Sequence, residues 1–82
     1  MLETAGVSTN EKMEEAAKLY DAAAEELEQA VAHWRTAARH FREGVVPRGA
    51  AHAWAALGHI KAAEESLDAQ ARAHARASNP EP

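Results

Sequence analysis

Apolar residues recur along residues 13–41 in alternating steps of four and three. The large ones are Met13, Tyr20, Leu27, Trp34 and Phe41, and the small ones between them are Ala17, Ala24, Val31 and Ala38. A repeat averaging about 3.5 residues keeps one stripe of an α-helix turned toward one partner over its whole length. Beside this stripe runs a column of alanines, Ala16, Ala23, Ala30 and Ala37. The pattern predicts a long helix that packs closely against another helix.

A second stripe with the same steps lies later in the chain. Its members are Ala50, Ala53, Leu57, Ile60, Glu64, Leu67, Ala71 and His74. If the chain folds back between the stripes, Phe41 lies opposite Ala50 and Ala24 opposite Leu67, so large residues mostly meet small ones. The same register sets Leu27 against Glu64. Either this pair is a polar layer that sets the register, or the second helix rotates and Ala63 faces the seam.

Helix start and stop signals divide the chain into one hairpin domain, residues 9–77, with a flexible lead at 1–8 and a flexible tail at 78–82. Ser8 and Glu11 fit a capping box for a first helix over residues 9–43. Gly44 suits the position just after a helix end, and Pro47 suits the first turn of the next helix. We expect that helix to begin near Arg48.

Gly58 lies inside the second predicted helix, where glycine costs about 1 kcal/mol relative to alanine. The helix is either continuous there or broken into two. Trp54, Gly58, Ile60, Ala63 and Leu67 resemble the inter-helix turn of a tetratricopeptide repeat over residues 50–67. The upstream tryptophan-leucine-glycine signature of that family is absent. The resemblance implies a helical module that binds other proteins.

The chain is too small to bury a large core by itself. A domain of 82 residues buries only roughly 60% of its unfolded surface, and this one has no cysteine to form a disulfide. Residues 49–60 carry no formal charge and surround Trp54. We expect a second copy to cover this surface in a four-helix bundle; the alternatives are a different protein or a fold-back at Gly58. The predicted interaction residues are Trp34, Phe41, Ala50, Trp54, Leu57 and Ile60.

Charge is segregated along the first helix. Residues 11–28 hold seven carboxylates against two lysines, whereas the turn end carries a basic patch of Arg35, Arg39, Arg42 and Arg48. This distribution complements the helix dipole, and it is also suited to guide antiparallel docking. The net charge of −4 argues against nucleic acid as a partner. With no membrane-spanning apolar run and no signal-peptide pattern, we expect a cytoplasmic location.

Four of the five histidines form pairs seven residues apart, His33 with His40 and His52 with His59. The register predicts that His33 lies near His59, and such a pair would respond to pH near about 6.5. His33 would oppose Gly58 and His40 would oppose Ala51. Without carboxylates beside them, we interpret these histidines as interface or solvated side chains and not as metal ligands.

No motif for a cofactor or a nucleophile occurs, and we expect a non-enzymatic interaction module with no cofactor. Its partner would be itself or another protein. One alternative comes from Arg35 and His40, which have four residues between them and resemble the active-site motif of HEPN-type helical ribonucleases. That resemblance implies a minimal ribonuclease in which both side chains act on a phosphate. A further alternative is a nucleic-acid-binding regulator that uses the basic end of the first helix.

Overall fold

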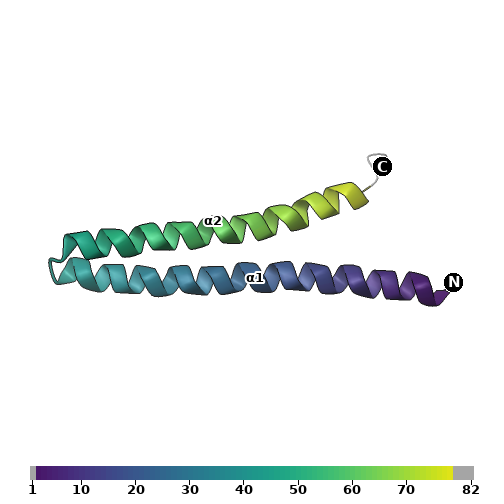
Figure 1. Cartoon of the computed structure of the whole chain (residues 1–82), viewed down its shortest axis with the longest axis horizontal. Helices are drawn as coiled ribbons and strands as arrows, with labels where there is room; N and C mark the ends of the chain where they lie inside the picture. Colours follow the sequence, from purple (N-terminus) through teal and green to yellow (C-terminus); the bar gives the residue numbers. More distant parts are fainter. Residues whose placement is uncertain (1, 79–82) are drawn as a thin grey trace.

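The computed structural model is a hairpin of two long α-helices (Figure 1). It describes the backbone of residues 2–78 and the side chains of residues 10–78. Helix α1 spans Leu2–Arg42 and helix α2 spans Val46–Ala77. The helices run side by side from the turn and separate toward the chain ends, and the molecule measures 64 × 27 × 15 Å. The predicted all-α helical hairpin is confirmed.

Gly44 makes the turn possible. Its φ of 77° is left-handed, a region that a residue with a β-carbon enters only at a cost. The Val45 N–H donates to the His40 carbonyl over 2.8 Å, and the Gly44 N–H donates to the Phe41 carbonyl over 3.0 Å. This pair of bonds is the Schellman arrangement, which satisfies carbonyls left over at a helix end. Pro47 then lies in the first turn of α2, as predicted.

Helix α1 begins earlier than the capping box predicted. Its helical backbone starts at Leu2, so Ser8 and Glu11 lie within the helix and not at its start. Extending a helix by one residue is far easier than nucleating one, and residues 2–8 contain no proline that would block extension. At the other end, Ser78 turns extended, with φ −84° and ψ 136°, and ends α2. Residues 79–82 of the predicted tail lie outside the described part of the chain.

Helix α2 is continuous through Gly58, so the break that we considered there does not occur. A β-carbon built on Gly58 would meet no atom within 4 Å, so the glycine is not required by a close contact. Its cost of about 1 kcal/mol is small beside the hydrogen bonds of the surrounding turns, and the neighbouring alanines are strong helix formers.

The seam between the helices is made of alanine and glycine, which corrects our prediction. The buried residues among those described are Ala23, Ala30, Ala37, Gly49, Ala56 and Ala63. The large residues predicted to fill the seam remain exposed: Trp34 and Phe41 each retain 48% of their accessible surface. The alanine column, which we placed beside the apolar stripe, is therefore the centre of the seam. Small side chains let two helix backbones approach closely.

The corrected seam also explains the Leu27 and Glu64 mismatch. Ala63 is only 2% exposed, so the alternative in which α2 rotates and Ala63 faces the seam is confirmed. Leu27 is 43% exposed, and Glu64 is exposed as well. Neither residue lies at the centre of the seam, so no buried polar layer forms at this pair.

Candidate functional site

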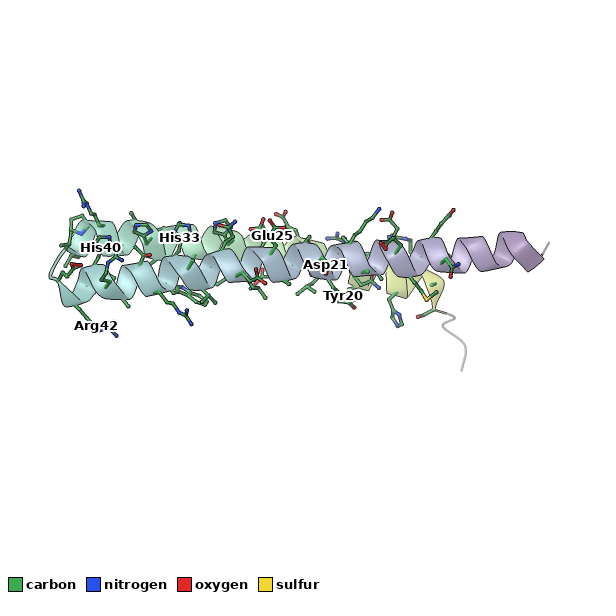
Figure 2. All side chains as sticks on the ribbon, turned by 90° about the horizontal axis from the view of Figure 1, so that it is seen from below. Tyr20, Asp21, Glu25, His33, His40 and Arg42 are labelled. Carbon is green, nitrogen blue, oxygen red and sulfur yellow. The ribbon has the colours of Figure 1, made fainter. Side chains whose placement is uncertain are left out.

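Two different surfaces flank the alanine seam. An α-helix advances about 100° per residue, so residues three and four places after a buried alanine lie on opposite sides of it. After Ala30 these residues are His33 and Trp34, and after Ala56 they are His59 and Ile60. Figure 2 shows the result: His33 and His40 project from one side of the hairpin, and Tyr20 projects from the other. We call the two surfaces the histidine row and the apolar face.

The apolar face carries large side chains from both helices on the side away from the histidines. Its members are Tyr20, Leu27, Val31, Trp34, Phe41, Leu57, Ile60 and Leu67. All but the half-buried Ile60 are exposed. Trp54 borders this face and is 72% exposed. A soluble chain rarely leaves so many large apolar groups together in water unless another surface covers them.

A shallow groove lies on the apolar face near the turn. It is lined by Phe41 from α1 and by Ala50, Ala53, Trp54 and Leu57 from α2. Four of the six predicted interaction residues therefore come together in one groove. Of the other two, Trp34 is exposed and Ile60 is half-buried. The structure places these six residues on or beside one surface, although it does not place them in the seam.

The histidine row crosses between the helices in a zigzag. His33 and His52 approach with 3.0 Å between their Nδ1 atoms, and their ring centroids lie 5.2 Å apart. His33 also stacks on His59, with centroids 5.4 Å apart, and His40 stacks on His52 at 5.5 Å. Each helix thus contributes two rings, and each ring touches at least one ring from the other helix.

The row has a carboxylate at one end and an unsatisfied nitrogen at the other. The Nδ1 of His59 lies 2.6 Å from Glu26 Oε2, close enough for a short hydrogen bond or an ion pair. At the end near the turn, Nδ1 of His40 is buried and has no hydrogen-bond partner in the described part of the chain.

The electrostatics of the row centre on His52. Partial burial lowers the pKa of this imidazole from its ordinary 6.5, and His33, His40 and Arg39 lower it further by repelling a positive charge. These causes act in the same direction, so the neutral form of His52 is favoured in the folded hairpin. A neutral ring is also what the His33 contact requires, since one Nδ1 must accept the proton that the other donates.

Sequence reasoning found part of this row. The predicted contact of His33 with His59 is confirmed. The prediction that His40 opposes Ala51 missed its stacking on His52, and the role of Glu26 was not predicted. The signal was present, because each histidine follows a seam residue by three places. Identifying the alanine column as the seam would have predicted all four rings to face one another.

The basic residues at the turn end are spread over the surface. Arg35, Arg39, Arg42 and Arg48 are all exposed, and Arg39 lies 3.8 Å from Glu43 in an exposed pair. Arg35 and His40 do not share a face: five residues of helix separate two side chains by about 140°. His40 is half-buried in the histidine row.

The described residues also bear on metal binding and on membrane crossing. The described residues contain no group of three or more histidine and carboxylate side chains placed to hold a metal ion. Neither α1 nor α2, over the residues described, has a stretch long and apolar enough to cross a membrane.

The chain matches no protein-family model, and comparisons with curated proteins and with solved structures found no significant match. Any function for the chain must therefore be argued from its two surfaces.

Proposed function

We propose that this chain is a small helical interaction module that self-associates through its apolar face, two hairpins forming a four-helix bundle. The observation that carries this proposal is the position of the large side chains. Trp34, Phe41, Leu57 and Leu67 keep 37% to 48% of their surface exposed, while alanine and glycine fill the seam. A second hairpin docked on this face would remove these side chains from water and supply the core that one hairpin lacks.

The energetics of one hairpin favour this proposal. Every buried apolar side chain in the described part is an alanine, and no larger side chain is fully buried. Burying a methyl group contributes much less than burying leucine or phenylalanine, each of which contributes about 1.5–3 kcal/mol. Ordering the chain costs roughly 1–2 kcal/mol per residue. An alanine seam by itself offsets little of that cost, so the exposed face is where further stabilisation is available.

The charge distribution favours a second copy as the occupant over an unrelated protein. The turn end of the hairpin is basic, through Arg35, Arg39, Arg42 and Arg48. The middle and open part of α1 is acidic, through residues 11–28. Two hairpins docked in opposite directions would set each basic end beside the acidic part of the other. Twofold symmetry would satisfy both contacts with the same residues.

Substitution of Trp54 tests the proposal. Because Trp54 is 72% exposed, Trp54→Ala removes apolar surface from the interface region while leaving the hairpin seam untouched. Lys61→Ala is the matched control, since Lys61 is exposed one heptad later in the same column of α2. Light scattering and sedimentation over a range of concentrations should show a dimer for the wild type and for Lys61→Ala. Trp54→Ala should dissociate at least about tenfold more readily, as expected for loss of a buried aromatic anchor.

Two results would count against self-association. A wild-type chain that is a folded monomer at every concentration would show that the apolar face does not bind its own copy. A dimer that Trp54→Ala leaves as stable as the wild type would mean that the interface lies elsewhere. In the first case a different protein becomes the better candidate for the same face, and the protein-binding role remains to be tested with that partner.

A further inference from the structure

The histidine row places four groups that can take up protons in contact with one another, and this feature does not depend on self-association. Four imidazoles from two helices contact one another with ring centroids 5.2 to 5.5 Å apart, beside the alanine seam that holds the hairpin together. Imidazole is the side chain whose charge ordinarily changes between pH 5 and 8. Any positive charge gained by one ring is therefore felt by rings of the opposite helix.

We propose that the histidine row is a proton-sensitive latch, which holds α1 and α2 together while its rings are neutral and loosens the hairpin when they become protonated. The His33 and His52 contact is the central element of the latch. Its 3.0 Å Nδ1 to Nδ1 bond needs one donor and one acceptor. When both rings are protonated, both nitrogens carry hydrogen, the bond is lost, and two positive charges remain in contact across the seam.

The charged groups around the histidine row make protonation more unfavourable at the His52 end and less unfavourable at the His59 end. His52 faces His33, His40 and Arg39 on α1, and Arg48 lies one turn before it on α2. Arg39 is partly compensated by Glu43, at 3.8 Å in an exposed pair. His59 faces His33 and Glu26, and the carboxylate can pair with a protonated ring. Protonation is therefore most disruptive at the His52 end of the row, near the turn.

The direction of the pH effect follows from His52. Its pKa is lowered in the folded hairpin from the 6.5 of an unperturbed imidazole. The unfolded chain therefore binds this proton more tightly than the hairpin does. Above the unfolded value the ring is neutral in both states and its contribution to stability is complete. As pH falls below that value, protonation favours the unfolded chain, and the contribution is lost until pH passes the lowered folded value.

Urea unfolding of the full chain at about pH 7.5 and about pH 5.5 tests the latch, because carboxylates stay largely ionised over this range. The double variant His33→Gln with His52→Gln keeps polar side chains but cannot take up protons. His74→Gln is the matched control, because His74 is exposed near the end of α2 and outside the row. The wild type and His74→Gln should lose stability at the lower pH, and the double variant should lose clearly less.

Nuclear magnetic resonance titration of the five imidazoles in the wild-type chain provides a second test that needs no substitution. The ring of His52 should titrate below the ordinary imidazole value of 6.5. A double variant that loses as much stability as the wild type would overturn the latch. So would titration of His52 at or above the ordinary imidazole value of 6.5. Both measurements report on folding or on proton binding. The latch can therefore be disproved while the apolar face still self-associates, and self-association can be disproved while the latch remains.

Discussion

Individual glycines show how closely the two helices approach. A β-carbon built on Gly49 would lie 2.7 to 2.9 Å from three ring carbons of Phe41, closer than such atoms can come without movement. Gly49 is buried in α2, and the Phe41 ring covers it from α1. Gly58, in the same helix, has open space around the equivalent position. The same residue type therefore serves close packing at one site and has no packing role at the other.

This contrast predicts that the same substitution changes the free energy of unfolding differently at the two sites. Gly58→Ala should raise the free energy of unfolding by about 1 kcal/mol, because alanine favours the helix and nothing opposes the new methyl group. Gly49→Ala should stabilise clearly less, or destabilise, because the Phe41 ring must move first. Chemical denaturation of both variants beside the wild type measures the difference. Equal stabilisation by the two substitutions would show that Phe41 gives way without cost.

At the scale of the helices, the seam depends on the small size of one column on each side. Ala30 and Ala56 are completely buried, and the buried members of α1 recur every seven residues through Ala23, Ala30 and Ala37. Larger residues at these positions would force the backbones apart and separate the rings of the histidine row. The spacing of the helices and the contacts of the row therefore have one common cause.

Enlarging one seam alanine tests this view of the helix pair. Ala30→Leu should lower the stability of the hairpin by about 1–3 kcal/mol, the usual cost of overpacking a filled site. Ala22→Leu makes the same change at an exposed position of α1, where leucine and alanine are both good helix formers. Thermal unfolding should show a lower midpoint for Ala30→Leu alone. If the two variants have the same midpoint, the helices are not held at close range by the alanine column.

At the scale of the whole molecule, the hairpin is much more elongated than a compact domain. The radius of gyration is 18.8 Å, whereas a compact chain of this length would have about 12 Å. One hairpin is thus a rod with a thin seam, and its large apolar groups lie on one broad side. A rod of this kind gains a core by pairing with a second rod, as the proposed bundle does.

Coupling of folding to self-association makes a prediction about the whole molecule. The midpoint of thermal unfolding should rise with protein concentration, because mass action favours the associated, folded state. Circular dichroism at several concentrations over a hundredfold range would measure this. The Lys61→Ala variant should follow the wild type, and Trp54→Ala should show a lower midpoint at each concentration. A midpoint independent of concentration would mean that the hairpin folds without a partner.

The local features of this chain could be predicted from its sequence, because they depend on neighbouring residues. The two helices, the left-handed Gly44, and Pro47 in the first turn of α2 follow from backbone preferences that act over a few residues. The contact of His33 with His59 followed from spacing and an antiparallel register. The start of α1 was predicted too late because a capping motif does not by itself stop a helix from extending.

Only the tertiary structure decided which stripe of each helix forms the seam. The alanine column and the large apolar stripe have the same repeat and lie side by side, so periodicity alone cannot distinguish them. The choice depends on how closely two backbones can approach, which is a property of both helices together. With Ala30 and Ala56 at the centre, Trp34 and Phe41 remain about half exposed and the histidines meet. Both candidate surfaces of this protein follow from that one packing choice.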